Sequence, residues 1–473
     1  MRHGAGLAAA ALGALLGCAN PFARPAWERP PPLAVDAPVV PEAVLHRAEL
    51  GNGMHILVLE DHRLPRVALG VTVRRGSASE PPGEAGLALY MAEVMERGAG
   101  SRDALALAEA VERLGARFAV SSGWDSTTVA LAGLSRDQGE LFGILGDAVR
   151  RPRFDAREAR RARDETLAAL EQAKDDPETL AAWSFARAVY AAHRYGTPRE
   201  GVRESALRFD AKSARGFHAR LFVPNDAILW ASGDIDLESF LARAGEVFGG
   251  WARGPVVDPG PPPPDPAPAA RRIVIVDRPD LEQAQIGLGH EGIMRTDPDR
   301  IAVSLMNDLL GGSGFSSRLM ERLRAEAGLT YSVGSGFSLR RARGPFSVLT
   351  FTRVPEVRRT LDLALSEIER FRSEPPDERE LQDARALAVG EFSLGLETSD
   401  AVLASLVDLD VYGLPEDSLD TYRARVRATT PAQIAELASR LLHPERAAIV
   451  LVGPAEALRP QVEGLGPIEV VRP

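Results

Sequence analysis

The chain has 473 residues, of which 45% are hydrophobic and 26% are charged, and its formal net charge is −10. This length favours about two to four globular domains with sizeable cores. The acidic balance disfavours a nucleic-acid partner, which would select a basic face. A single cysteine, Cys18, excludes an internal disulfide.

The first residues have the pattern of an export signal. A short basic start precedes an apolar run over residues 5–17, which is too short to span a bilayer. The run ends in Leu-Leu-Gly-Cys18, which resembles a bacterial lipobox. We therefore expect residues 1–17 to be a signal peptide and Cys18 to carry a lipid that anchors the chain to a membrane. The alternative is an ordinary secretory signal with an incidental cysteine. Ala19, where an Asp would favour the inner membrane, points by convention to the outer membrane, facing the periplasm.

Two proline-rich stretches divide the rest of the chain. Residues 18–44 predict an extended tether, and residues 254–270, which include Pro261 to Pro264, predict a stiff linker. The segments between and after them, residues 45–253 and 271–473, are of similar size. We predict one domain in each.

The two predicted domains have the pattern of an internal repeat. Residues 224–233 and 444–453, separated by 220 positions, both predict a buried strand closed by a glycine. Each domain also opens with strands, expected at 56–59, 67–73, 272–276 and 284–288. Helices are expected at 85–97, 156–174, 178–192, 299–310, 357–373 and 377–396. Strands grouped apart from helices predict the α+β class, with a sheet covered by helices on one face in each domain. Two such domains could enclose a cleft and form one half of a clamshell.

Residues 86–98, GLALYMAEVMERG, carry the most informative motif. They resemble the zinc helix of the pitrilysin/insulinase peptidase family, which includes the mitochondrial processing peptidase. In active members an H-x-x-E-H motif supplies two histidine ligands and a glutamate general base, and a distal glutamate completes the ligand set. The matching positions here are Leu89, Ala92 and Glu93, with the distal position at Ala169. Glu165 is one helical turn from that position.

The histidines of the chain support the loss of the zinc site. No two of the eight lie three to five residues apart, so no helix can present a histidine pair. The resemblance therefore implies a chain that binds no metal or other cofactor itself and is inactive alone. An autonomous zinc peptidase, or a zinc site assembled from distant histidines, is disfavoured.

A second motif lies in the C-terminal domain. Residues 323–333, LRAEAGLTYSV, resemble a family motif in which an arginine and a tyrosine seven residues apart reach the zinc site. In that motif they hydrogen-bond the substrate backbone and the developing oxyanion. Arg324 and Tyr331 occupy these positions. A solvated arginine and a core aromatic residue are the alternatives when each residue is taken alone.

The glycine-rich stretch Gly311-Gly312-Ser313-Gly314 allows two interpretations. It resembles a family loop that has been proposed to handle substrate. It is equally well explained as a flexible turn at the C-terminal end of a helix. It is no phosphate-binding loop, because no Gly-Lys-Ser/Thr follows.

The loss of the zinc ligands and the retention of the Arg–Tyr pair together suggest a role. We expect a non-catalytic or co-catalytic subunit of a heterodimeric envelope metallopeptidase. Its partner would be a related chain with an intact H-x-x-E-H motif and the zinc ion, and Arg324 and Tyr331 would assist in trans. Peptides or unfolded segments would be the substrates. The alternative is a non-proteolytic scaffold or peptide-binding lipoprotein of the same fold, in which the pair simply persists.

Overall fold

The computed structural model describes residues 38–40, 44–256 and 270–472. The predicted signal peptide and Cys18 lie outside these residues, as do most of the predicted tether and residues 257–269 of the predicted linker. None of the helices in the described ranges is long and apolar enough to span a membrane.

The first half of the chain is built on a six-stranded sheet with the strand order β1-β2-β8-β3-β7-β6. Strands β2 and β8 are parallel, and the other neighbours are antiparallel. The strands are β1 (Leu45–Glu49), β2 (His55–Glu60), β3 (Arg66–Val73), β6 (Arg117–Ser122), β7 (Thr127–Leu134) and β8 (Ala227–Gly233). β3 is buried at every position after Arg66, because it lies inside the sheet and both of its faces are covered.

Helices of the first half pack their apolar stripes on one face of this sheet and form its main core. They are α2 (Leu87–Met95), α3 (Ala104–Arg113), α4 (Gln138–Arg150), α5 (Ala156–Ala173), the short α7 (Arg203–Ala206), α8 (Ala211–Leu221) and α9 (Leu237–Phe248). Several begin at an aspartate whose carboxylate accepts a backbone N–H of the first turn, namely Asp103, Asp155, Asp210 and Asp236. These caps fix where the helices start.

The second half repeats the plan with a sheet of order β11-β12-β10-β13-β9-β14. Its strands are β9 (Arg272–Asp277), β10 (Gln283–Glu291), β11 (Val333–Phe337), β12 (Pro345–Arg353), β13 (Ala448–Gly453) and β14 (Ile468–Val471). Its helices include α10 (Arg300–Asn307), α12 (Val357–Ser373), α13 (Glu378–Leu394), α15 (Ser418–Ala428), α16 (Pro431–Leu441) and α17 (Ala455–Val462). The short α11 (Arg318–Met320) lies between two π-helical turns, Asp308–Gly312 and Glu321–Glu326. The predicted α+β class with two related sheets is thus confirmed.

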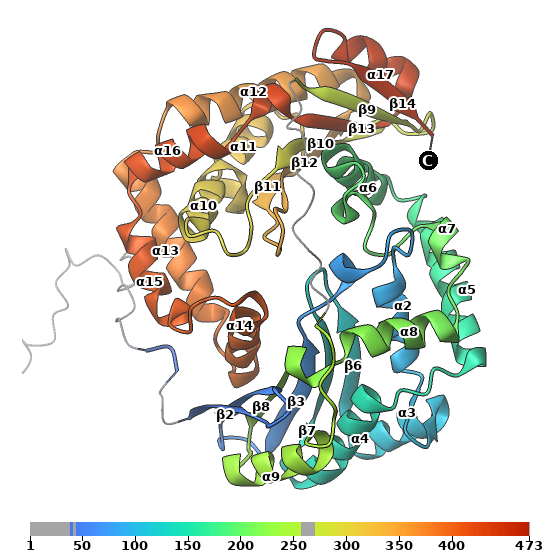
Figure 1. The fold of residues 1–473 in the computed structure, drawn as a ribbon. Coiled ribbons are helices and arrows are strands. Elements are labelled where there is room, and N and C mark those ends of the chain that lie inside the picture. Colours follow the sequence, from blue (N-terminus) through green and yellow to red (C-terminus); the bar gives the residue numbers. More distant parts are fainter. Residues whose placement is uncertain (1–37, 41–43, 257–269, 473) are drawn as a thin grey trace, which may run out of the picture. The chain divides into compact units, whose positions relative to one another are not determined.

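The halves exchange one helix each, which the sequence did not predict (Figure 1). Helix α6 (Pro177–Tyr190) of the first half packs on the second sheet, where Phe185 joins a cluster with alternate residues of β13 such as Val450 and Val452. Helix α14 (Ser399–Tyr412) of the second half packs on the first sheet, against Leu57 and Ile228. The remaining residues of these strands face the other side, so each sheet is covered on both faces. The predicted arrangement, with helices on one face only, is therefore incomplete.

A buried histidine makes the fold sensitive to acid. The His290 ring is 8% exposed. Its Nδ1 donates to the Glu291 carbonyl (2.8 Å), and its Nε2 accepts the His443 N–H (3.0 Å). Burial lowers its pKa to about 4. The neutral ring stabilises the fold fully above the unfolded pKa of about 6.5, and this stability is lost as the pH falls toward 4.

We therefore expect the free energy of unfolding to fall between pH 7 and pH 4.5, with a contribution from His290 of up to about 3 kcal/mol. Urea titrations at several pH values measure it. His290→Gln should reduce this dependence, and His218, whose pKa burial also lowers to about 4, should account for part of what remains. His62→Gln is the control, because a hydrogen bond with Asp234 raises the pKa of His62, which gives its small contribution the opposite sign. An unchanged pH dependence in His290→Gln would contradict the assignment.

Candidate functional site

Helix α2 carries the three positions of the degenerate zinc motif. Leu89 is half-buried, Ala92 is buried and Glu93 is partly exposed. The start of the helix is held by Glu80, whose carboxylate accepts the N–H groups of Gly86 (3.2 Å) and Ala88 (2.8 Å) and binds Arg194. Burial raises the pKa of Glu80 to about 7, although Arg194 acts in the opposite direction. The helix is thus fixed in place, as a site helix needs to be, but without ligands for a metal.

The side chain of Arg97 forms ion pairs with the carboxylates at this motif. The Arg97 guanidinium lies 2.5 Å from a carboxylate oxygen of Glu93 and 2.5 Å from one of Glu165 on α5, and 3.9 Å from Glu158. Hydrogen bonding from Arg97 lowers the pKa of Glu165 to about 2, whereas burial raises the pKa of Glu93. A fixed positive charge therefore lies between the two carboxylates nearest the motif.

These residues do not fit a zinc ion. Zinc needs three protein ligands and an open position for water, whereas the motif positions offer one carboxylate, Glu93, which is already bound to Arg97. Ala169, the predicted distal position, is exposed on α5, and the α5 carboxylate that reaches the cluster is Glu165. Within the described part of the chain, no group of three His, Cys, Asp or Glu side chains is placed to hold a metal ion.

Removing the arginine should expose the repulsion between the carboxylates. We expect Arg97→Met to lower the free energy of unfolding at pH 7 by about 1 kcal/mol, a value kept small because both carboxylates are partly exposed. The loss should shrink as the pH falls and the carboxylates are protonated. Urea titration at pH 7 and pH 5 measures both effects. The control is Arg161→Met, which removes a more exposed partner of Glu165; equal losses in the two variants would contradict a special role for Arg97.

The second predicted pair forms a stack on the surface. The Arg324 guanidinium lies 4.6 Å from the centre of the Tyr331 ring and 4.5 Å from the centre of the Phe315 ring. Tyr331 is 72% exposed and Phe315 is 75% exposed. A guanidinium over aromatic rings gains cation–π attraction, so its orientation is restrained without a salt bridge. Arg324 and Tyr331, which the family resemblance pairs, are thus in contact in the structure, and their catalytic role stays a prediction.

Phe315 was not among the predicted site residues. It follows the glycines of residues 311–314, and its only signal in the sequence is an aromatic residue directly after a flexible stretch. The π-helical turn Asp308–Gly312 contains the first two glycines, and the π-helical turn Glu321–Glu326 follows α11. Such turns are frequent at functional sites. The loop therefore contributes an aromatic side chain to the Arg–Tyr pair, which favours a functional role over a simple helix end.

The donors of this stack are free to bind a ligand. In the described residues, no carboxylate pairs with Arg324 and nothing hydrogen-bonds the Tyr331 hydroxyl. A planar guanidinium edge and a phenol can donate to a peptide carbonyl or to an oxyanion. No hydrogen bond, ion pair or ring contact within the described ranges joins this stack to the cluster around Glu93 and Arg97.

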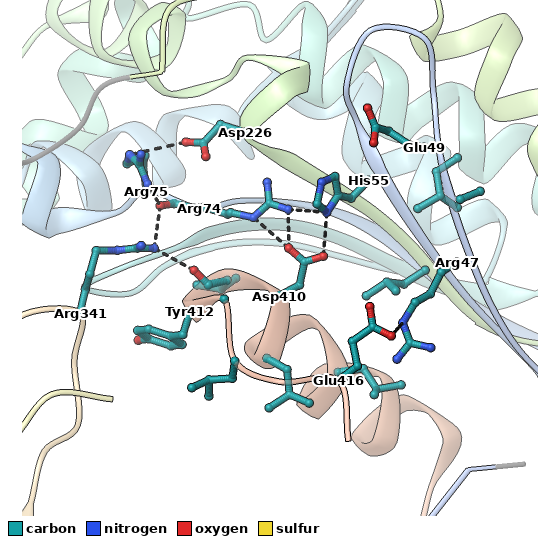
Figure 2. A pocket seen from close by; sticks show the side chains of 18 residues that line it. Arg47, Glu49, His55, Arg74, Arg75, Asp226, Arg341, Asp410, Tyr412 and Glu416 are labelled. Carbon is teal, nitrogen blue, oxygen red and sulfur yellow. Dashed lines mark hydrogen bonds and ion pairs between the residues drawn. The ribbon is translucent and has the colours of Figure 1, made fainter. Parts of the chain in front are cut away.

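A cavity of about 770 Å³ lies where α14 meets the first sheet. Figure 2 shows that its charged groups point toward one another: the Asp410 carboxylate binds Arg74 (2.9 Å) and His55 (2.9 Å), and Arg75 lies near Asp226 (3.5 Å). Burial would raise the pKa of Asp410, but the hydrogen bonds from His55 and Arg74 outweigh it and lower that pKa. The pairs of Asp410 with Arg74 and His55 connect α14 to the first sheet, whereas Glu49, which also lines the cavity, has no ion pair among the described residues.

Comparison with known proteins shows the family of the chain. The model for insulinase, peptidase family M16, matches residues 55–201, and the model for the peptidase M16 inactive domain matches residues 208–387. The chain belongs to peptidase family M16. The second match covers the segment with Arg324 and Tyr331, and the first covers the degenerate zinc motif.

Relatives of this M16 protein extend over nearly its whole length. An uncharacterised zinc protease of Streptomyces coelicolor is 24% identical over 87% of this chain and 90% of its own, and one of Mycobacterium tuberculosis is 26% identical over 88% and 95%. A crystal structure of a peptidase M16 inactive domain from Pseudomonas fluorescens is 27% identical, with a TM-score of 0.80 over 87% of this chain and 98% of that one. The first half of the periplasmic protease PqqL from Escherichia coli has the same fold, with a TM-score of 0.71 at 15% identity over 90% of this chain and 95% of that one.

Proposed function

We propose that this M16 chain is the co-catalytic subunit of a two-chain metallopeptidase in a bacterial envelope, anchored through a lipid on Cys18. The partner is a related chain with an intact H-x-x-E-H motif, which holds the zinc. The main observation behind the proposal is the exposed stack of Arg324 and Tyr331, whose hydrogen-bond donors have no partner among the described residues. In the same chain, the one carboxylate at the zinc-motif positions, Glu93, is bound by Arg97. The residues at this motif favour a role without zinc, whereas Arg324 and Tyr331 are donors suited to stabilising a transition state.

In this proposal the two donors act on the substrate carbonyl in the partner's active site. When that carbonyl is attacked, negative charge develops on its oxygen, and the Tyr331 hydroxyl donates a hydrogen bond to it. Arg324 donates from its planar edge to a neighbouring peptide carbonyl and holds the substrate in register. Stacking on Phe315 and Tyr331 fixes the guanidinium before substrate binds, which lowers the ordering cost.

The substrate strand is held by the partner's sheet in this proposal. A peptide could add to the edge strand β6, which is next to α2. The Val120 N–H of β6, however, already donates to the Glu96 carboxylate at 2.6 Å. A side chain that occupies an edge N–H blocks strand addition at that point. This favours a supporting role for the chain.

The test uses the mature chain and a zinc-motif paralogue from the same genome, first separately and then mixed. We expect no stoichiometric zinc in this chain, measured by mass spectrometry, and hydrolysis of a quenched fluorogenic peptide only by the mixture. Hydrolysis by the paralogue alone at the same rate would overturn the proposal and favour a scaffold. Stoichiometric zinc in the isolated chain, together with peptide hydrolysis by that chain alone, would also overturn the proposal and would show an autonomous zinc peptidase.

A further inference from the structure

A groove distinct from the stack lies between the two halves of the described chain. Its volume is about 940 Å³. Its walls are α5, α6 and the segment 196–204, and its floor is the outer part of the second sheet, where β9 and β14 run. The large apolar side chains of the lining include Leu167, Leu170, Leu180, Trp183, Val274, Val276 and Val471. The groove includes the edge strand β14, and an exposed edge strand is a place where an extended peptide can lie.

Four arginines line the groove without an ion pair or side-chain hydrogen bond within the described residues: Arg187, Arg203, Arg272 and Arg472. The Nε of Arg272 is buried and has no hydrogen-bond partner in the part of the chain that the structure describes. By contrast, the groove residue Lys174 binds its neighbour Glu171 at 3.3 Å. Two further carboxylates, Glu204 and Glu469, also line it, so unpaired positive groups exceed unpaired negative ones. A buried donor without an acceptor is costly, and an anionic ligand would satisfy it.

We propose that this groove binds an extended acidic peptide segment that carries apolar side chains. Its apolar side chains would cover the floor formed by Val274, Val276 and Val471, and its carboxylates would pair with the arginines, with Arg272 receiving a bidentate contact. The charge of the lining selects the acidic segment over a basic one. The site does not include Arg324 or Tyr331, so it is independent of the co-catalytic role.

The test uses the mature full chain and a fluorescein-labelled peptide of alternating glutamate and leucine, followed by fluorescence anisotropy. We expect saturable binding that weakens with salt, because charge pairs at the rim are screened. Arg272→Glu and Arg203→Glu should each weaken binding by about tenfold. Arg379→Glu, an exposed arginine on α13 outside the groove, should leave it unchanged. Circular dichroism checks that each variant is folded. If Arg272→Glu does not fold, Arg272→Gln replaces it in the binding test.

Three outcomes would overturn the proposal. If a glutamine–leucine peptide binds as tightly as the glutamate–leucine peptide, the groove does not select for negative charge. Equal weakening by Arg379→Glu would show non-specific attraction. Failure of the acidic peptide to bind, with binding of vesicles of phosphatidylglycerol that depends on Arg272, would assign the groove to an anionic lipid surface. None of these results bears on whether the partner needs Tyr331, so the two proposals fail separately.

Discussion

Tyr331→Phe should lower peptide turnover by the two-chain complex about a hundredfold, the typical loss when one oxyanion donor is removed. The phenylalanine ring still stacks on Arg324, so the change removes only the hydroxyl. The interaction exists in the transition state and not with the ground-state carbonyl, so kcat and kcat/KM should fall together while KM changes little. Steady-state kinetics of the reconstituted complex measure both values.

Arg324→Lys makes the complementary test of this stack. Lysine keeps the charge but loses the planar fork, so we expect a higher KM as well as slower turnover. The matched control is Arg322→Lys, on the same π-helical turn but paired with Glu326, and it should behave like the unaltered chain. If Tyr331→Phe leaves turnover intact while complex formation is normal, the pair is a remnant of ancestry.

Phe185→Ala should lower the free energy of unfolding by about 3–5 kcal/mol, the usual cost of removing a buried phenylalanine side chain. Phe185 is 4% exposed and lies in the cluster that α6 forms on the second sheet. The loss should destabilise both halves, because α6 belongs to the first half and its contacts belong to the second. Urea unfolding followed by tryptophan fluorescence and by circular dichroism measures whether both signals shift together.

The reciprocal variant, Leu403→Ala, makes the same test from α14. Leu403 is 1% exposed and contacts the first sheet, so we expect a loss of about 2–5 kcal/mol and a single transition. Leu105→Ala is the control, because this leucine on α3 is 69% exposed and its removal should cost little. Two separate transitions, with each variant moving only one of them, would contradict coupling between the halves.

The elements that sequence reasoning located best are those with strong local signals. The predicted helices 156–174 and 357–373 correspond to α5 and α12, whose amphipathic patterns are clear. The repeated strands at 224–233 and 444–453 correspond to β8 and β13, which are buried and end at a glycine. Local pattern sufficed because α5 and α12 each bury one apolar stripe, and because β8 and β13 are apolar at nearly every position.

Features that depend on contacts between distant residues could not be predicted from the sequence. Helix α14 was not predicted, because its buried residues, such as Val402, Leu403 and Val411, do not follow one amphipathic stripe. Nor does spacing show that the Arg97 side chain lies between Glu93 and Glu165, since this contact joins α5 to the end of α2. The same holds for Phe315, whose ring reaches Arg324 only through the turn of the loop.

The exchange of α6 and α14 also bears on how the chain is made. During synthesis β8 leaves the ribosome long before residues 399–412 do, and at about 5–20 residues per second the delay is on the order of ten seconds or more. Throughout that interval the face of the first sheet around Leu57 and Ile228 has no helix to cover it. An uncovered apolar sheet face favours aggregation. The first half therefore cannot cover both faces of its sheet until residues 399–412 have emerged and α14 has formed.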